Sequence, residues 1–294
     1  MTHALVCIGD LVEDVVVWSA GTTRAGTDNP ARIRRSRGGA ASNVAVFASS
    51  LGTSTRFVGR VGDDAAGAAL VQDLVDAGVD ARVQRQGSTG TIVILVDDAG
   101  ERTMYPDRAA AAELTDVPDA WLSGADVIHL SAYSLAGPSL SVLRRASGIA
   151  QAEGAILTVD ASSIALIDAL GPTRFRDLIR ILRPTYIFAN GIEADVGDLR
   201  GLAEPGTTVV VKNGVEPTEI HLDGAKTVTV DVSPVGEVLD TTGAGDAFAA
   251  AFLSAVLAGA DAVEAVRAGH GLASRVLREP GATLSPDEIG VARD

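Results

Sequence analysis

Short runs of Val and Ile alternate with longer stretches rich in Ala and Leu along most of the chain. The short runs predict strands that are buried on both faces, and the longer stretches predict amphipathic helices. The expected strands are residues 5–8, 56–61, 127–130, 156–160, 186–189 and 209–212, and the expected helices are residues 42–51, 65–77, 139–152, 173–182 and 193–202. This alternation predicts an α/β fold with a doubly wound, mostly parallel sheet and helices on both faces.

Two regions break this rhythm. Residues 12–37 and 91–106 alternate between apolar and polar positions, contain turns such as the Asp-Asp-Ala-Gly of 97–100, and add no helix. A period of two residues is typical of strands with one exposed face. We therefore expect these two segments to build a small β-sheet lid that projects from the main sheet. Because no linker or repeat divides the chain, residues 1–294 are expected to form one domain that includes the lid.

The charge balance argues against nucleic acid as a partner. The 294 residues include 24 basic and 38 acidic side chains, which gives a formal net charge of −14. Such a chain repels nucleic acid and anionic membranes at long range, so we expect neither as a partner. Lysine is especially scarce, since only Lys212 and Lys226 occur. A mechanism that needs a lysine therefore has two candidates.

The cysteine and histidine content argues against a disulfide framework and a zinc site. Cys7 is the single cysteine, and the four histidines lie far apart in the sequence. The apolar run 247–260 is shorter than a membrane span and is expected to be a buried helix. The N-terminus lacks the regions of a signal peptide. Together these features predict a cytoplasmic protein.

The most informative segment is Asp-Thr-Thr-Gly-Ala-Gly-Asp at 240–246, which runs directly into an apolar helix. The amides of Gly243, Ala244 and Gly245 would converge at the helix N-terminus, where backbone N–H groups attract anions and glycine permits close approach. At the rim of this site, the Asp246 carboxylate would serve as a base toward an attacking hydroxyl. The alternative is that Asp246 is an ordinary helix N-cap.

This segment resembles, almost letter for letter, the second signature of the ribokinase-like, or PfkB, carbohydrate kinase family. Gly-Gly-Ala-Ala-Ser-Asn at 38–43 resembles the first signature, and Val-Gly-Asp-Asp at 61–64 fits the same family. The resemblance covers essentially the whole chain and implies a ribokinase-like fold. It also implies ATP-dependent transfer of phosphate to a hydroxymethyl group of a small carbohydrate, with Asp246 as base and the glycine turn as anion hole.

The resemblance assigns a second group of residues to the acceptor. Asp14 stands where the family holds an aspartate that grips a sugar diol, and Asp10 is a further candidate. The paired glycines Gly38 and Gly39 would let the sugar lie against the backbone. Asn43 would bond a sugar hydroxyl. Polar acceptors of this kind give specificity for hydroxyl groups.

The identity of the acceptor stays open. Arg102, Tyr105 and Arg108 would be able to meet a carboxylate, so a keto-deoxy sugar acid is an alternative acceptor, unless these residues are only exposed lid residues. Val12 and Ala40 stand where the ribose-type pattern has Asn and Lys. These two departures argue against ribose itself.

On the nucleotide side, Asn190-Gly-Ile-Glu193 follows a predicted strand and matches the family's Asn-x-x-Glu element. The resemblance implies that Asn190 and Glu193 organise Mg²⁺ and its waters around the phosphates of ATP. The other reading of Glu193 is a residue that simply begins a helix. The expected cofactors are therefore ATP and Mg²⁺.

Three further residues are assigned to the nucleotide. Lys212 and Gly214 end a predicted strand, and His270 lies in the segment that resembles the family's adenine-side helix. Lys212 replaces a threonine of the family, and Pro217 replaces a glycine. Lys212 would either meet a phosphate or lie in solvent at the strand end.

A monovalent cation such as K⁺ is a further expectation beside the anion hole. By the same resemblance, its candidate ligands are Asp240, Thr242, Gly281 and Ser285. Backbone carbonyls supply much of such a site.

Other readings remain. A nucleoside of the adenosine or pseudouridine type is an alternative acceptor, with Phe47 or Tyr133 stacking on the base. A non-catalytic protein that senses a sugar or nucleotide is the alternative from another class. The exposed strands of the lid also suggest a homodimer through the lid. The chain contains neither a P-loop nor a dinucleotide fingerprint, which argues against those nucleotide-binding folds.

Overall fold

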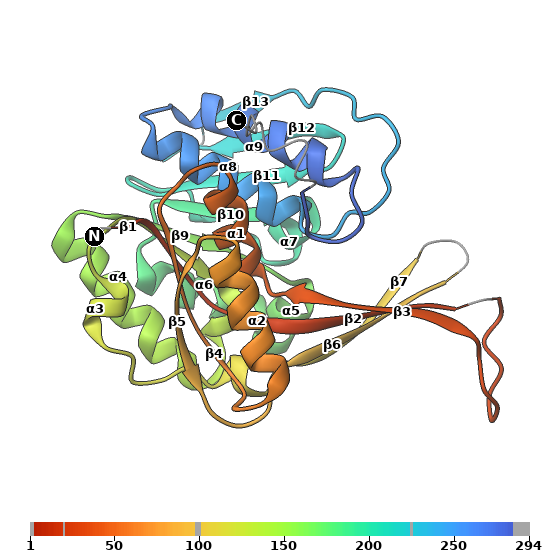
Figure 1. Ribbon diagram of the computed structural model, residues 1–294. Coiled ribbons are helices and arrows are strands. Elements are labelled where there is room, and N and C mark those ends of the chain that lie inside the picture. Colours follow the sequence, from red (N-terminus) through yellow and green to blue (C-terminus); the bar gives the residue numbers. More distant parts are fainter. Residues whose placement is uncertain (1–2, 20, 98–100, 224–225, 285–294) are drawn as a thin grey trace, which may run out of the picture.

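The computed structural model describes residues 3–19, 21–97, 101–223 and 226–284. Within them, the main sheet has the strand order β13-β12-β11-β10-β9-β8-β1-β4-β5 (Figure 1). In that order its strands are β13 (Thr227–Val230), β12 (Glu216–His221), β11 (Thr208–Asn213), β10 (Tyr186–Asn190), β9 (Ile156–Asp160), β8 (Ala125–Ser131), β1 (His3–Ile8), β4 (Thr55–Val61) and β5 (Asp80–Arg85). This large sheet with its helices confirms the expected α/β fold.

The strands from β11 to β5 run parallel to their neighbours, and all six strands expected from the sequence are among them. Their carboxyl ends therefore share one edge of the sheet, where Asn190 pairs in register with Lys212 and Phe188 with Asp160. Strands β12 and β13 extend the sheet as an antiparallel edge. They were not expected, because polar residues interrupt β12 and it carries Pro217.

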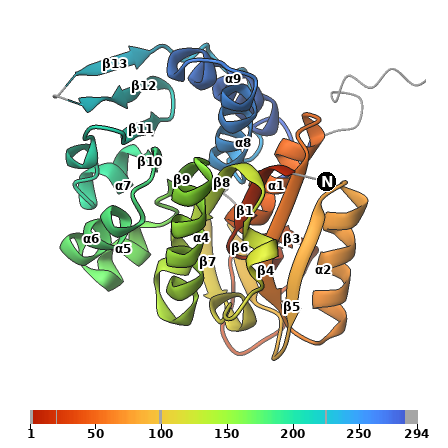
Figure 2. The same cartoon turned by 90° about the vertical axis from the view of Figure 1, so that its left-hand side faces the viewer.

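Helices cover both faces of the sheet and bury a separate apolar core on each. The first face carries α1 (Ala40–Ser50), α2 (Ala65–Asp76), α8 (Ala244–Leu257) and α9 (Ala262–Val276). The second carries α3 (Asp119–Leu122), α4 (Leu140–Glu153), α5 (Ile164–Leu170), α6 (Pro172–Leu182) and α7 (Gly191–Val196). In Figure 2, α8 and α9 lie together near α1, and α5 to α7 form a separate group. Among the helices of the described ranges, none is long and apolar enough to cross a membrane.

A second sheet projects from the body, and we call it the lid sheet (Figure 1). Its strand order is β3-β2-β6-β7, made from β2 (Val12–Ser19), β3 (Ala31–Gly38), β6 (Thr91–Val96) and β7 (Arg102–Asp107). Strands β2 and β6, far apart in the sequence, pair in parallel at its centre. The expected accessory sheet is thus confirmed, although residues 98–100 of the expected turn lie outside the described residues.

The lid sheet is fastened to the body by Asp64, a residue of the Val-Gly-Asp-Asp segment. Its carboxylate accepts hydrogen bonds from the amide of Gly67, where it caps α2, and from the amide and hydroxyl of Thr89, just before β6. A Cβ atom on Gly62 would lie 2.3 Å from the amide nitrogen of Thr89. This segment therefore holds the start of β6 against the start of α2.

One expected helix is wrong in extent. The sequence predicted a continuous helix over 193–202, but α7 ends at Val196 and Asp198 has a left-handed φ of 47°. A backbone in this region cannot continue a right-handed helix. A short 3₁₀ helix follows, and such helices lie at Ala109–Ala112, Ala132–Leu135, Gly137–Ser139 and Arg200–Leu202.

Candidate active site

A cavity of about 720 Å³ opens where strands β9, β10 and β11 end. Asp160 and Asn190, the last residues of β9 and β10, and Lys212 near the end of β11 line it together with the first turn of α8 and with His270 of α9. Ligands of open α/β sheets bind at this edge, because loops and helix N-termini converge there. The structure thus brings the candidate nucleotide residues to one place.

A tight turn leads into α8 on one wall of the cavity. Gly243 precedes the helix with a φ of 76°, which glycine adopts at little cost. A Cβ atom there would also lie 2.5 Å from the Cβ of Ala282. Ala244 and Gly245 line the cavity, and their amides belong to the first helical turn, which lacks intrahelical carbonyl partners; the Ala244 amide makes a long 3.4 Å hydrogen bond to the Thr241 carbonyl.

Asp246 lies inside the first turn of α8, and the N-cap is Gly243. The reading of Asp246 as an ordinary N-cap is therefore wrong. Its carboxylate accepts a hydrogen bond from Asn43 Nδ2 at 2.8 Å. Burial raises the pKa of Asp246 to about 8, the carboxylate of Asp160 acts in the same direction, and the ammonium of Lys212 opposes the shift. A carboxylate with a pKa near neutral is suited to proton transfer.

The amide of Asn43 is oriented from its other side by Arg37, the last arginine of β3. Arg37 Nη1 donates to Asn43 Oδ1 at 2.6 Å. Because a guanidinium only donates, it fixes the amide oxygen toward itself and turns the amide nitrogen toward Asp246. The chain Arg37–Asn43–Asp246 therefore joins the lid sheet, α1 and α8.

Lys212 is buried in the cavity and is not a strand-end lysine in solvent. Its Nζ lies 3.1 Å from Asp160 Oδ2, and a Cβ atom added to Gly245 would lie 3.3 Å from Nζ. Burial opposes its charge, but Asp160, Glu193 and Asp246 outweigh that effect and raise the pKa of Lys212. A protonated amine therefore stands beside the glycine turn.

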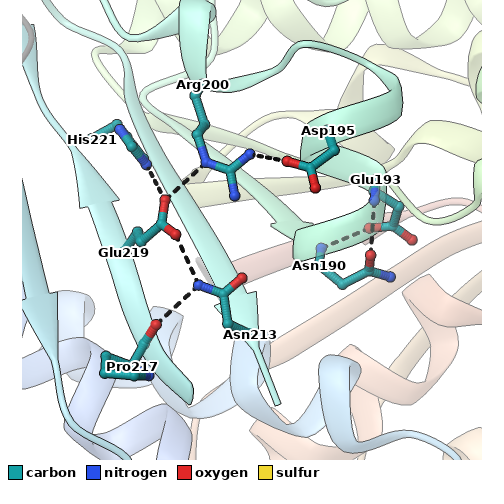
Figure 3. Close-up of polar contacts among 8 residues, drawn as sticks. All are labelled: Asn190, Glu193, Asp195, Arg200, Asn213, Pro217, Glu219 and His221. Atoms are coloured by element: carbon teal, nitrogen blue, oxygen red, sulfur yellow. Dashed lines mark hydrogen bonds and ion pairs between the residues drawn. The ribbon is translucent and has the colours of Figure 1, made fainter. Parts of the chain in front are cut away.

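Asn190 and Glu193 hold each other in a reciprocal capping box at the start of α7. The Asn190 side chain accepts from the amide of Glu193 at 2.9 Å, and Glu193 Oε2 accepts from the amide of Asn190 at 2.8 Å. In Figure 3 the second carboxylate oxygen of Glu193 points away from Asn190. Burial, with the nearby Asp160, raises the pKa of Glu193. The reading of Glu193 as a helix-start residue is thus correct, and it leaves one oxygen available.

A chain of polar contacts fixes the hairpin beside this helix (Figure 3). Glu219 accepts hydrogen bonds from Arg200 Nε at 2.8 Å, His221 Nε2 at 2.6 Å and Asn213 Nδ2 at 3.1 Å. The bond from Arg200, above all, lowers the pKa of Glu219 to about 2. Asn213 also donates to the carbonyl of Pro217 at 2.9 Å. Pro217 therefore closes the β11–β12 turn with its carbonyl.

The part of the cavity lined by His270, Phe248 and Gly214 is less polar. His270 Nε2 is hydrogen-bonded to the Thr218 hydroxyl at 2.8 Å, and its ring lies against Phe248, with centroids 5.6 Å apart. Gly214, between β11 and β12, has a φ of 64° and open space where a Cβ atom would stand. These residues line the same cavity as Lys212.

The candidate acceptor residues gather where β1 ends and the lid sheet begins. Asp10 and Asp14 each have a buried Oδ1 atom without a hydrogen-bond partner among the described residues. Burial and the neighbouring Asp10 raise the pKa of Asp14 to about 6, although Arg102, Arg37 and Arg108 oppose the shift. Buried acceptor oxygens without donors are costly, so such oxygens suit a ligand that brings hydroxyl groups.

The paired glycines make this arrangement possible. A Cβ atom on Gly38 would lie 2.2 Å from Asp14 Oδ1, and one on Gly39 would lie 2.4 Å from the carbonyl oxygen of Asp10. Gly39 also has a φ of 108°. The glycines thus let α1 begin directly against both acidic residues.

The lid arginine Arg108 is paired with Asp10. Its Nη1 lies 2.7 Å from Asp10 Oδ2, and its guanidinium covers the ring of Tyr133 at 3.3 Å. Phe47 is only 1% exposed and belongs to the core beneath α1. Tyr105 is exposed on the lid sheet. Neither Phe47 nor the covered face of Tyr133 is available to stack on a base.

The candidates for a monovalent cation site meet in part. Asp240 accepts hydrogen bonds from the Thr242 amide and hydroxyl and from the Gly281 amide, and Arg102 Nη1 lies 3.0 Å from Asp240 Oδ1. Burial would raise the pKa of Asp240, but these donors hold it below its ordinary value. Ser285 lies outside the described residues. Among the described residues, the Arg102 guanidinium therefore already supplies a positive charge at Asp240, where a monovalent cation was expected.

Sequence reasoning missed two residues of the site. Asp160 ends β9 and bonds Lys212, and Arg37 bonds Asn43. A carboxylate at the end of a predicted strand was the available signal for Asp160. Within the described ranges, no group of three or more His, Cys, Asp or Glu side chains is placed to hold a metal ion by itself.

The chain is similar to known kinases along most of its length. The profile of the pfkB family carbohydrate kinases matches residues 2–289. A nucleoside kinase from Methanothermobacter thermautotrophicus is 30% identical over 273 residues, which cover 89% of this chain and 84% of that protein. An uncharacterized sugar kinase from Archaeoglobus fulgidus is 34% identical over 250 residues, which cover 80% of this chain and 95% of that protein.

A solved structure has the same fold along nearly the whole chain. The adenosine kinase from Sinorhizobium meliloti superimposes with a TM-score of 0.83 and 25% sequence identity, and the match covers 96% of each chain.

Proposed function

The chain belongs to the pfkB family of carbohydrate kinases, and from this premise we propose that it transfers the γ-phosphoryl group of ATP to a hydroxymethyl group of a small sugar. Its kinase relatives make it a phosphotransferase with a hydroxyl acceptor, so the reading as a non-catalytic sensor is set aside. The position of Asp246 is the observation that best supports phosphate transfer from ATP to a sugar hydroxyl. Asp246 lines the cavity, bonds Asn43, and is affected by the charge of Asp10 from the acceptor side.

Asp246 would act as the base. Its carboxylate takes the proton from the acceptor O–H group as that oxygen forms a bond to the γ-phosphorus. The bond between the γ-phosphorus and the bridging oxygen of ADP breaks in line with the attack, and ADP leaves. A positioned base contributes a factor of about 10² to 10⁴ in rate.

Two kinds of donor would stabilise the transferring group. The amides of Gly243 to Gly245 form the proposed anion hole, and the Lys212 ammonium lies beside Gly245. Fixed dipoles and a buried charge are most effective in a cavity that excludes water. Lys212 would thus bind phosphate from the position where the family pattern has a threonine.

Magnesium would bind near Asn190 and Glu193. Carboxylate and amide oxygens are hard ligands, and the described residues offer too few acidic side chains for a cage made by the protein alone. Asn190 and Glu193 would therefore hold the ion through its waters, and the ion would neutralise phosphate charge.

The acceptor side favours a neutral sugar. The free oxygens of Asp10 and Asp14 accept hydroxyl donors, and the nearby cations Arg108 and Arg102 already have carboxylate partners. A sugar acid would have to compete with those pairs. A nucleoside would find the Tyr133 face covered. We therefore place a neutral sugar first and a nucleoside second, as the name of one relative suggests.

The decisive experiment is an ADP-release screen with Mg²⁺ and one acceptor at a time. The panel contains pentoses, hexoses, fructose phosphates, 2-keto-3-deoxygluconate, adenosine and pseudouridine. Release that depends on a neutral sugar supports the proposal. Release with a nucleoside alone moves the second candidate to first place, and release that no acceptor stimulates contradicts both.

Two other expectations stay predictions. The lid sheet would close over the acceptor and exclude water, which otherwise accepts the phosphate. A homodimer through the β7 side of the lid is supported by the exposed side chains of Met104 and Tyr105, which are 53% and 57% exposed. Sedimentation would test it.

A further inference from the structure

The carboxylate of Asp240 opens the turn that leads to Gly243 and Asp246, and its surroundings are specific. The Thr242 amide donates to Oδ1 at 2.8 Å, the Thr242 hydroxyl donates to the same atom at 2.5 Å, and the Gly281 amide donates to Oδ2 at 2.9 Å. All three partners direct hydrogen atoms at the carboxylate. Asp240 therefore ties the catalytic turn to the loop that follows α9.

The positive charge at this carboxylate comes from the lid sheet. Arg102, the first residue of β7, places Nη1 at 3.0 Å from Asp240 Oδ1, and both side chains are more than four-fifths buried. A second lid arginine, Arg34 of β3, donates to the carbonyl of Pro280 at 3.3 Å. Two arginines from opposite edges of the lid sheet thus contact the body at neighbouring points.

Among the described residues, a metal cation at Asp240 Oδ1 would have to displace the Arg102 guanidinium. The cavity lined by Arg34, Arg102, Asp240 and Gly281 has a volume of about 20 Å³, enough for roughly one water molecule, and both guanidinium groups already border it. A potassium ion needs oxygen lone pairs around it. Here the Asp240 carboxylate and the Pro280 carbonyl already accept from Arg102 and Arg34, and these two guanidinium ions would repel the cation.

We propose that the Arg102 guanidinium takes the place of a monovalent cation at Asp240, so that contact with the lid sheet orders the catalytic turn and activity is independent of potassium. The kinetic part of this inference rests on the proposed function. Arg102 is a positioning residue, since it acts on the turn through Asp240. An open lid would remove the guanidinium and leave Asp240 with its neutral donors alone.

The test compares potassium, sodium and tetramethylammonium chlorides at equal ionic strength on the full chain. Thermal unfolding and acceptor-dependent ADP release are measured for the wild type, for Arg102→Ala and for Arg102→Gln. The matched control is Arg35→Ala, because Arg35 is another lid arginine whose partner, Glu13, lies on the lid sheet itself.

The wild type and Arg35→Ala are expected to unfold and react alike in all three salts. Potassium is expected to raise the unfolding temperature of both Arg102 variants and to restore their rate by at least about fivefold, a typical coupling between sites. Arg102→Gln keeps the length of the side chain, so it serves if the alanine variant does not fold.

Potassium-specific stabilisation or activation of the wild type overturns the proposal. The proposal is also overturned if both Arg102 variants have the unfolding temperature and rate of the wild type. It is overturned as well if potassium does not restore the unfolding temperature and rate that the variants have lost. If no acceptor is found, the proposed function fails, and the unfolding temperatures still decide this inference.

Discussion

The two ends of the site are built in different ways. On the nucleotide side, several contacts join residues close in sequence, such as Asn190 with Glu193, three positions away, and Asn213 with Pro217, four positions away. Lys212 and His270 on the same side each reach a partner 52 positions away. On the acceptor side, Arg108 bonds Asp10 across 98 positions and Asn43 bonds Asp246 across 203. Local turns thus contribute to the nucleotide side, whereas the acceptor side depends on contacts of longer range.

The difference also concerns which polar groups are satisfied. On the nucleotide side, Asn190 and Glu193 bond each other reciprocally and Glu219 accepts hydrogen bonds from three partners (Figure 3). The acceptor side keeps free oxygens on Asp10 and Asp14. Polar groups that already have hydrogen-bond partners are stabilised little by a bound ligand. Buried acceptor oxygens without partners are stabilised when a ligand donates hydrogen bonds to them. The following substitutions test this contrast.

The largest effect is expected from Asp246→Asn, which removes the base where the two sides meet. Turnover should fall by at least about 10²-fold, because an amide cannot accept the proton. ATP binding and the fold should persist, since the substitution keeps the shape of the side chain. Steady-state ADP release and nucleotide titration measure the two properties.

The control for this change is Asp177→Asn, on the exposed face of α6, where the partner Arg180 is 3.7 Å away. It should leave turnover unchanged. Near-normal turnover in Asp246→Asn would contradict the assignment of the base.

Lys212→Met tests the lysine of the nucleotide side, whose side chain is only 18% exposed. Loss of a donor at the transferring group should lower kcat by about 10²-fold. Asp246 accepts a proton only when ionised, so wild-type kcat/KM for the acceptor should rise with pH through about 8. Without the Lys212 ammonium, which lowers the pKa of Asp246, this rise should move to higher pH. An unchanged pH profile would show that Lys212 does not affect the pKa of the base, Asp246.

Gly38→Ala tests the acceptor side alone. Its Cβ atom would enter the space of the Asp14 carboxylate, 2.2 Å away, and displace it. Losing a hydrogen bond to a charged group should raise the KM of the acceptor by about tenfold. The KM of ATP should change little. Gly148→Ala is the matched control, because open space surrounds Gly148 on α4; a rise in both KM values would mean that the two sides are not separate.

The smallest effect is expected from Glu219→Gln, in the network of Figure 3. The pKa of Glu219 lies at about 2, below its ordinary 4.5. A carboxylate with a lowered pKa stabilises the fold above its ordinary pKa, and this contribution is lost as the pH falls toward the lower value. The glutamine variant should lose about 1 kcal/mol near neutral pH, with little change in kcat.

Urea unfolding at several pH values between 4.5 and neutrality, and again below 4.5, measures this loss. The difference in free energy of unfolding between wild type and variant should decrease as the pH falls below 4.5. A constant gap would show that the charge of Glu219 is not what stabilises the hairpin.

The same contrast explains what the sequence reveals. The parallel strands other than β5 were predictable because burial on both faces makes them apolar, whereas β5 at the edge is partly exposed and polar. The glycine turn before α8 was predictable because its geometry is local. Edge strands β12 and β13 were not, because exposure leaves them polar. The end of α7 depends on the left-handed backbone of Asp198, which no pattern of hydrophobic residues signals.

Long-range contacts explain the rest of the unpredicted site. The resemblance pointed to Asp14, Asn43 and Asp246, but it gave no role to Arg37 and placed a cation where Arg102 reaches Asp240. These contacts depend on how the lid sheet sits on the body. Arg102 and Asp240 lie far apart in the sequence and share no local pattern from which their pairing follows, and the contact of Arg37 with Asn43, six positions away, depends on how β3 leads into α1.

The arginines of β3 have a consequence for solubility. The strand lies at an open edge of the lid sheet and contains four arginines within eight residues, in a chain whose net charge is −14. Unpaired edges invite other chains to add to the sheet. Two copies that approached along β3 would bring arginine against arginine, Arg32 and the 68%-exposed Arg35 among them. The strand that supplies Arg37 to the site thus also disfavours aggregation along its exposed edge, because its arginines repel those of a second copy.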